Sequence, residues 1–475
     1  MKKIFTLGRM FAGHRRRRSS FSTCRSGLLL ILAWVGAGAN LSALTFDEAW
    51  ELVRGEHGSL RAAELDRQRL ERLEAATRSL MLPQINLEGR YTRMNDDIRI
   101  DLDPLLGLLP GLPPGLPPLG VTVQDEEFWK ANLSAVWPLY TGGRISAARA
   151  AASLELEAAS EQTRRTLHEL HSDLVRRYFA VPLARQILST YEAVRDGADQ
   201  HRRHALRLEE EGLISPAERL HAEVAHAEAD RAARHAARRL EIAQTVLALF
   251  LNLEEQPNVT TPLPDPQTGD VAESAPWRTR ARRDHPVLGA LEANRRLAAE
   301  GHRVERGRML PEVFAFGRRE LVTSDLTLLE PEWAVGVGVN WAILDRTDRV
   351  NRMRAARLRE RQVEALAAQV ERDLQTLVES RLLEVRNAAE QFETLERVLD
   401  LARENLRVRE RAFAEGLATS LEVVDARIGL ARSEAARAAA RYEFTVQYAL
   451  LHEAAGGIET FARILSAPAF STAQP

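Results

Sequence analysis

The chain contains an internal duplication. A five-residue segment at 211–215 recurs at 415–419, 204 residues later, as Glu211-Gly212-Leu213-Ile214-Ser215 and Glu415-Gly416-Leu417-Ala418-Thr419. Each copy follows a long run of helix formers with apolar periodicity and precedes another such run. Glycine tolerates the positive φ that a tight turn between antiparallel helices requires. The repeated segment therefore predicts two similar helical hairpins in one chain.

Further matches at fixed offsets extend the duplication. Trp137-Pro138-Leu139-Tyr140 and Trp341-Ala342-Ile343-Leu344 are also 204 residues apart, whereas Met81-Leu82-Pro83 and Met309-Leu310-Pro311 are 228 apart. The offsets differ by 24 residues, which lie in the first half and include a Pro/Leu/Gly tract at 102–120. This tract is predicted to be a loop inserted into one copy of a common architecture.

Residues 1–39 have the pattern of a secretory signal peptide. A basic region including Arg15 to Arg18 precedes a short apolar core from Leu28 to Val35 and a small-residue cleavage site, Ala37-Gly38-Ala39. The alternative is an N-terminal anchor. Cys24, the single cysteine, lies in this segment, so the remainder should hold no disulfide and no cysteine-bound metal. Removing the eight basic residues of this segment changes the net charge from −2 to −10, which argues against a nucleic-acid partner.

Four segments alternate apolar and polar residues with the period of a β-strand. They predict strands at about 84–94 and 128–140 in the first half, and at about 312–322 and 332–343 in the second. The segment from Val313 to Arg319 alternates less clearly. Phe314 and Phe316 fall on the face opposite to the one that the repeat predicts to be apolar.

Two tryptophans mark the apolar face of each of the two clearest strands. Trp129 and Trp137, like Trp333 and Trp341, are eight residues apart, which is roughly 26 Å in a strand. The apolar band of an outer-membrane barrel is about 25 Å tall and is flanked by aromatic girdles. We therefore predict that these four residues are membrane-interface aromatics. The alternative is a soluble sandwich, but the small residues on the second face favour a wet lumen.

Very long helices should follow each pair of strands. Heptad spacing of apolar residues from Val385 to Phe413 is typical of a coiled coil. Thr45 to Leu82 should also be helical, and Pro182 is expected to bend or interrupt the first long helix. The predicted units are a first repeat at 40–255 with helices at about 143–211 and 215–252, an irregular linker at 256–276, a second repeat at 277–457 with helices at about 346–415 and 419–456, and a tail at 458–475.

The duplicated order of helix, strand, strand, long helix, Gly turn and helix resembles TolC-like outer membrane efflux channels over nearly all of the chain after residue 39. The most specific motifs are the segment from Trp137 to Arg144 and the pattern Phe413, Gly416, Thr419, Val423, Ala426. The resemblance implies a mainly α fold with a small β part, in which three copies close a 12-stranded β-barrel and a periplasmic α-helical tunnel. It also implies a passive conduit for small molecules or proteins, with outer-membrane lipid, a periplasmic adaptor and an inner-membrane pump as partners and no cofactor.

The resemblance assigns site residues near the second Gly turn. Glu422 and Asp425 share a helix face and align with the acidic pair at the closed periplasmic end of such channels, where three copies would form a cation-selective constriction. The family usually has two Asp here, so the longer Glu422 is a departure. The alternative is a solvated acidic pair on an ordinary helix surface.

The two Gly turns match the tips that dock an adaptor's helical hairpin in the family. The implied docking residues are Gly212, Leu213, Ile214, Ser215, Gly416, Leu417, Ala418 and Thr419. Exposed Leu and Ile at a turn suit a partner's groove, although turn chemistry alone also explains the glycines. The family can place a basic gating residue at the position of Ala418, so that particular latch is not expected here.

Two H-x-x-H pairs, His168/His171 and His201/His204, have a spacing that can hold a metal. Because no third ligand follows at a fixed spacing, solvated histidines are the favoured interpretation. No catalytic or nucleotide-binding motif occurs, so an enzyme is not expected. Two alternative functions remain: a periplasmic adaptor, which should lack duplicated strand pairs with Trp girdles, and a coiled-coil scaffold, which needs no strands.

Overall fold

The structure, a computed structural model, describes residues 43–101, 120–266, 273–327, 330–343, 348–458 and 461. The chain divides into two units, 1–42 and 43–475, and the description concerns the second. The predicted signal peptide with Cys24, nearly all of the loop at 102–120 and most of the tail at 458–475 lie outside the described residues.

The second unit is mainly helical with a small β part, which confirms the predicted fold class. Its helices are α1 (Phe46–Glu56), α2 (Gly58–Ala76), the 3₁₀ helix η1 (Thr77–Met81), α4 (Arg144–Glu210), α5 (Pro216–Phe250), α6 (Ala275–Asp284), α7 (Pro286–Gly307), α8 (Arg349–Ala414) and α9 (Ser420–Ala454). Over the described ranges, no helix has both the length and the apolar content needed to cross a membrane.

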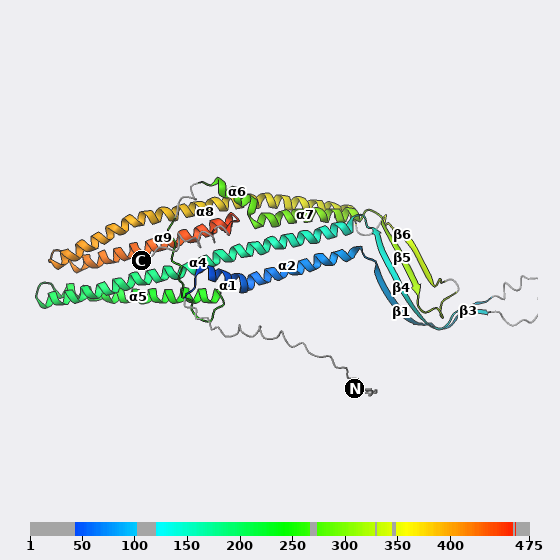
Figure 1. Cartoon of the computed structure of the whole chain (residues 1–475), viewed down its shortest axis with the longest axis horizontal. Helices are drawn as coiled ribbons and strands as arrows, with labels where there is room; N and C mark the ends of the chain where they lie inside the picture. Colours follow the sequence, from blue (N-terminus) through cyan, green and yellow to red (C-terminus); the bar gives the residue numbers. More distant parts are fainter. Residues whose placement is uncertain are drawn as a thin grey trace, which may run out of the picture. The chain divides into compact units, whose positions relative to one another are not determined.

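Two antiparallel hairpins, α4 with α5 and α8 with α9, form one half of the helical part, and α2 and α7 run beside the other halves of the long helices (Figure 1). Helix α4 also contacts α7 and α9, so it joins the two repeats. Of the two effects predicted for Pro182, a bend or an interruption, the interruption does not occur: α4 continues through this residue.

Glycine turns close both hairpins, as the duplicated segment predicts. Gly212 and Gly416 have φ values of 73° and 75°, in the left-handed region. After each glycine, the next backbone N–H donates to a carbonyl five residues earlier: Leu213 N to Leu208 O and Leu417 N to Ala412 O, both at 2.8 Å. These bonds satisfy carbonyl groups that the helix end leaves free.

Four antiparallel strands form one sheet in the order β1-β4-β5-β6. They are β1 (Gln84–Arg93), β4 (Glu127–Tyr140), β5 (Glu312–Glu320) and β6 (Trp333–Asn340). Because β4 pairs with β5, the two repeats share a single sheet. A second small sheet, β2 (Ile98–Asp101) with β3 (Gly120–Gln124), was not predicted and flanks the loop at 102–120.

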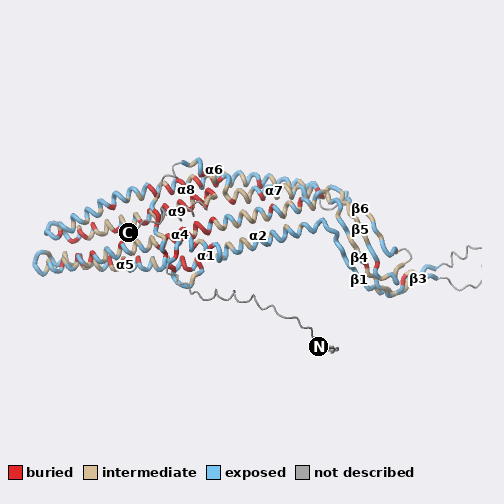
Figure 2. The backbone as a smooth tube through the Cα atoms, viewed as in Figure 1, coloured by how far each residue is buried: buried red, intermediate tan, exposed pale blue. Residues whose placement is uncertain are grey.

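The register gives the four-stranded sheet two different faces, because residues paired across strands lie on the same face. The first, which we call the outward face, holds exposed Trp and aliphatic side chains: Ile85, Leu87, Trp129, Leu133, Trp137, Trp333, Val335, Val337, Val339 and Trp341. The opposite, inward face is mostly polar and includes Asn86, Glu88, Arg90, Lys130, Asn132, Ser134, Arg318 and Glu320. Figure 2 shows that most strand residues are exposed.

Phe314 and Phe316 lie on the inward face, and packing explains this departure from the repeat. Their register partners on β6 are Gly338 and Gly336. A Cβ at Gly338 would lie 2.5 Å from the Phe314 ring, and one at Gly336 would lie 2.8 Å from the Phe316 ring. The two phenyl rings therefore occupy the space that the glycines leave open.

The helix predicted from Thr45 to Leu82 is broken at His57, which corrects that expectation. The Nδ1 atom of His57 accepts a hydrogen bond from Ser59 N at 3.3 Å and so caps α2. His285 does the same for α7 through Val287 N at 3.2 Å. The two histidines occupy equivalent positions in the repeats, so each repeat begins with a short helix and a histidine-capped second helix.

Buried residues concentrate where α1 and the linker after α5 pack against α4 (Figure 2). The Tyr178 hydroxyl donates to the Leu44 carbonyl at 2.7 Å and accepts from Thr261 N at 3.2 Å. Phe46 stacks on Phe179 with ring centroids 5.6 Å apart. These contacts hold the chain that enters the first repeat and the linker that leaves it against the same long helix.

Candidate functional site

The tips of the two hairpins expose apolar side chains. Leu213 is 67% exposed and Leu417 is 78% exposed. Ile214 and Ala418 are partly exposed. An exposed leucine on each of two equivalent turns contributes little to the protomer's own core, so these side chains are available to another molecule.

Glu422 is bound into the second turn. Its Oε2 atom accepts from Thr419 N at 2.8 Å, and the Thr419 hydroxyl accepts from Glu422 N, which forms a reciprocal capping box. Its Oε1 atom pairs with Arg409 Nη1 at 2.6 Å. The hydrogen bond from the Thr419 backbone, followed by the charge of Arg409, lowers the pKa of Glu422. The carboxylate is therefore charged but already satisfied.

Asp425 has a different environment although it lies one turn further along α9. Its side chain is exposed, and no hydrogen bond or ion pair to it is found within the described ranges. The structure thus separates the two acidic residues that the sequence paired. Asp425 is free to interact with another chain or an ion, whereas Glu422 maintains the turn.

Glu218, the counterpart of Glu422 in the first repeat, caps the other hairpin instead of its own. Its Oε2 atom accepts from Ser420 N at 2.9 Å, at the start of α9. The side chain of Ser215, the N-cap of α5, accepts from Glu218 N. A carboxylate at a helix N-terminus is stabilised by the free N–H groups and the helix dipole. Glu218 therefore ties the first hairpin to the second close to both tips.

His201 adds a second connection between the hairpins. Its Nε2 atom lies 2.6 Å from the Ser420 hydroxyl. Its ring packs on Phe413 of α8 with centroids 4.6 Å apart. Burial, and secondarily the charge of Arg427, lowers the pKa of His201 to about 4. The imidazole is thus neutral near pH 7 and acts as a hydrogen-bonding partner within the interface.

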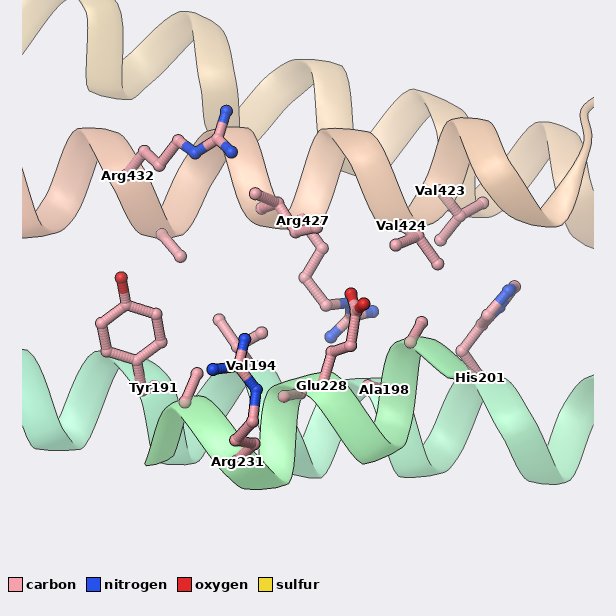
Figure 3. A pocket seen from close by; sticks show the side chains of 15 residues that line it. Tyr191, Val194, Ala198, His201, Glu228, Arg231, Val423, Val424, Arg427 and Arg432 are labelled. Atoms are coloured by element: carbon pink, nitrogen blue, oxygen red, sulfur yellow. The ribbon is translucent and has the colours of Figure 1, made fainter. Parts of the chain in front are cut away.

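Arg427 crosses the space between the hairpins. Figure 3 shows its side chain extending from α9 toward α4 and α5, beside Val194 and Glu228. Its guanidinium pairs with Glu410 and lies against the backbone of Gly197, where a Cβ atom would be only 1.3 Å from Nη1. Together with Tyr191, Val424 and neighbours on the three helices, Arg427 lines a cavity of about 260 Å³.

The histidines of the two H-x-x-H pairs are mostly buried rather than solvated. His168, His171 and His201 are buried, which corrects the favoured interpretation from the sequence. His171 contacts Trp50 with ring centroids 4.7 Å apart and is surrounded by aromatic rings. Across the described residues, no group of three or more His, Cys, Asp or Glu side chains is arranged to hold a metal ion.

The comparisons with known proteins agree with this architecture. The sequence profile of outer membrane efflux proteins matches residues 50–253 and 277–457. The chain belongs to the outer membrane efflux protein family. Membership of this family indicates that the chain is not an enzyme.

Individual relatives are more distant. The chain is 31% identical to protein CyaE of Bordetella pertussis over 193 residues, which are 40% of the chain and 41% of CyaE. The chain therefore spans less than half the length of that relative. In structure it resembles CusC, with a TM-score of 0.71, 17% identity, and 87% and 92% of the two chains covered. It also resembles the open MtrE outer membrane channel of Neisseria gonorrhoeae, at a TM-score of 0.68, 18% identity and coverages of 87% and 89%.

Several residues that join the tips were not predicted from the sequence. Glu218 lies 204 residues before Glu422, so the duplication could have marked it as an equivalent position. Its partner could not have been predicted, because the same local pattern directs Glu422 to its own N-cap. Ser420 and His201 carry no local signal for their contact, which depends on how α4 packs against α9.

Proposed function

We propose that the chain is the protomer of a trimeric outer membrane channel, with its helical part in the periplasm, that exports small molecules or proteins delivered by an inner-membrane pump. Family membership supports export across the outer membrane. The sheet supports the trimer. Its outward face is mostly apolar with two pairs of tryptophans, whereas its inward face is mostly polar.

The main support for this proposal is that both edge strands of the sheet, β1 and β6, are unpaired on one side within the described part of the chain. Among the described strands of this sheet, β1 pairs only with β4 and β6 pairs only with β5. An open edge is not tolerated in lipid, because its N–H and C=O groups have no water to bind. Three copies would join β6 of one protomer to β1 of the next and close a barrel of 12 strands. The second candidates from the sequence, an adaptor and a soluble scaffold, do not account for an exposed apolar sheet face.

The trimer is tested with protein purified from outer membranes. We expect a heat-modifiable trimer on gels and discrete conductance steps when the protein is added to planar lipid bilayers. A protein that remains monomeric in lipid and conducts no current would contradict the channel. Val337→Arg, on the outward face, should lower barrel stability by about 2–4 kcal/mol if this residue faces the bilayer midplane.

We further propose that the two tips dock the helical hairpin of a periplasmic adaptor. The exposure of Leu213 and Leu417 supports this assignment. Leu213→Asp and Leu417→Asp should abolish efflux and cross-linking to the adaptor while trimers persist. Leu249→Asp, at the opposite end of α5 and 74% exposed, is the matched control and should leave cross-linking unchanged. Equal cross-linking in all three variants would refute docking at the tips.

The tips are also the proposed gate. Three copies of Asp425 around a narrow lumen would repel one another and favour a bound divalent cation. The earlier expectation treated Glu422 as an equal partner, but its carboxylate is bound by Thr419 and Arg409. Asp425→Asn should therefore weaken cation selectivity and divalent block in bilayers by itself. Glu422→Ala should chiefly disturb tip closure, and adding it to Asp425→Asn should reduce selectivity little further. Unchanged selectivity in Asp425→Asn would remove this residue from the constriction.

A further inference from the structure

One cation on the mostly apolar outward face of the sheet has no acidic partner among the described residues. Arg319 is exposed, and its register partners are Leu133 on β4 and Trp333 on β6. These residues are 42% and 63% exposed and belong to the outward face. Because β5 is a central strand, both of its neighbours come from the same protomer.

The other basic residues of the described strands are all paired with carboxylates. Their ion pairs are Arg90 with Glu88, Arg93 with Glu126 and Glu127, Arg99 with Asp97, Lys130 with Glu330, and Arg318 with Glu320. No ion pair or hydrogen bond of the Arg319 side chain is found within the described ranges. The residues of β1 that lie on the outward face, such as Leu87 and Tyr91, supply no carboxylate either.

The position of Arg319 along the strand limits what it can contact. β5 starts at Glu312, directly after the helices. Arg319 is its second-last residue and pairs with Trp333, the first residue of β6, so it lies at the ends of these two strands that are far from the helices, beside Leu133 midway along β4. An arginine facing lipid costs about 2–4 kcal/mol at the bilayer midplane but about 0–1 kcal/mol near the interface. Its aliphatic stem can lie along apolar neighbours while the guanidinium reaches the headgroup layer.

We propose that Arg319, beside Trp333, binds a phosphate group of an outer-leaflet lipid headgroup. The inference rests on the proposed outer-membrane residence of the sheet. A guanidinium binds phosphate oxygens through parallel N–H donors, which a carboxylate-free site leaves available. The adjacent indole suits the boundary between headgroups and acyl chains. Each trimer would then hold three such lipids, one on the central part of each protomer's sheet.

The test is native mass spectrometry of purified trimers titrated with bisphosphorylated lipid A, and in parallel with the dephosphorylated lipid. Wild-type trimers should retain the phosphorylated form in preference. Arg319→Gln should weaken its binding about tenfold, the loss expected for one charge-assisted hydrogen-bonded contact. Arg318→Gln is the matched control, because Arg318 is the adjacent residue, lies on the inward face and pairs with Glu320. It should bind lipid A like the wild type.

The remaining outcomes are also decisive. Equal affinity of Arg319→Gln and wild type for lipid A would overturn the site, as would equal binding of the phosphorylated and dephosphorylated lipids. Displacement of lipid A by inorganic phosphate alone would show a phosphate site without lipid specificity and would also overturn the assignment. Trimers that conduct current yet show no dependence on Arg319 would leave the channel intact and reject only the lipid site.

Discussion

The indole N–H of Trp137 donates a hydrogen bond to the backbone carbonyl of Met81 at 2.9 Å. Trp341 makes the equivalent bond to Met309 at 3.1 Å. The sequence repeats the Trp donor and the Met acceptor of this bond, but at different offsets. The tryptophans are 204 residues apart and the methionines 228, because the first repeat carries the additional residues around the loop at 102–120. The bond therefore joins the end of a strand to the end of the preceding helix in each repeat, where the helical part meets the sheet.

These two bonds should stabilise the junction in equal measure. Trp137→Phe and Trp341→Phe keep an aromatic ring at the apolar edge but remove the donor. Each should lower the free energy of unfolding by roughly 0.5–1.5 kcal/mol, the usual net value of such a bond. The measurement is the temperature at which trimers dissociate on gels. Trp333→Phe, at the other end of the sheet, is the control and should have a smaller effect. A larger loss in the control would show that ring size, not the hydrogen bond, governs stability.

The packing of Phe314 over Gly338 gives a second prediction. Gly338→Ala would place a Cβ atom 2.5 Å from the phenyl ring and should destabilise the barrel. Gly317→Ala places its Cβ 3.6 Å from the nearest Val335 atom, an ordinary contact, and should be tolerated. Combining Gly338→Ala with Phe314→Leu should recover part of the loss, because neighbouring residues are coupled. Additive losses in the double variant would place the ring elsewhere.

A third prediction concerns acid stability. His171 is fully buried, and neither of its ring nitrogens has a hydrogen-bond partner within the described part of the chain. Burial lowers its pKa from 6.5 to about 3, with smaller contributions from His168 and His452. In the unfolded chain His171 therefore binds a proton below about pH 6.5, whereas in the folded chain it binds one only near pH 3. The contribution of His171 to the free energy of unfolding is therefore fully present above pH 6.5 and is lost as the pH falls toward 3.

The test compares the unfolding temperature of wild type and His171→Leu between pH 7.5 and pH 4.5. The variant should lose less stability on acidification. It should not lose all of the pH dependence, because the pKa of His452 is also lowered, to about 4, by burial. Leucine also avoids leaving two unpartnered nitrogens in the core, so no large loss is expected at pH 7.5. Parallel pH profiles for the two proteins would exclude His171 as the cause.

The sequence predicted the repeats, the strands and the Gly turns because each depends on local spacing that occurs twice. The helix break at His57 was not predicted, because a histidine N-cap carries weaker local signals than Ser or Asp. The burial of His171 could not be predicted, since it depends on Phe46 and Trp50 packing across from α1. The contact of Glu218 with Ser420 has the same cause: the local pattern supplies the carboxylate, and tertiary packing decides which helix it caps.

The last prediction tests whether contact between the hairpins keeps the tips closed. Arg427 lies against Gly197 of α4 because that residue has no side chain. Gly197→Ala should favour the helix itself by roughly 0.5–1 kcal/mol. However, the new methyl group would displace the guanidinium and loosen α9 from α4. We therefore expect a folded trimer with a larger fraction of high-conductance openings in planar bilayers.

Gly429→Ala on α9 is the matched control. It should bring a similar gain in helix preference, but no atom lies within 4 Å of its added Cβ. Conductance in this variant should equal that of the wild type. Arg427→Ala should open the channel as Gly197→Ala does, and combining the two should add little, because both remove the same contact. If Gly197→Ala conducts like Gly429→Ala, the packing of Arg427 on α4 does not hold the tips together.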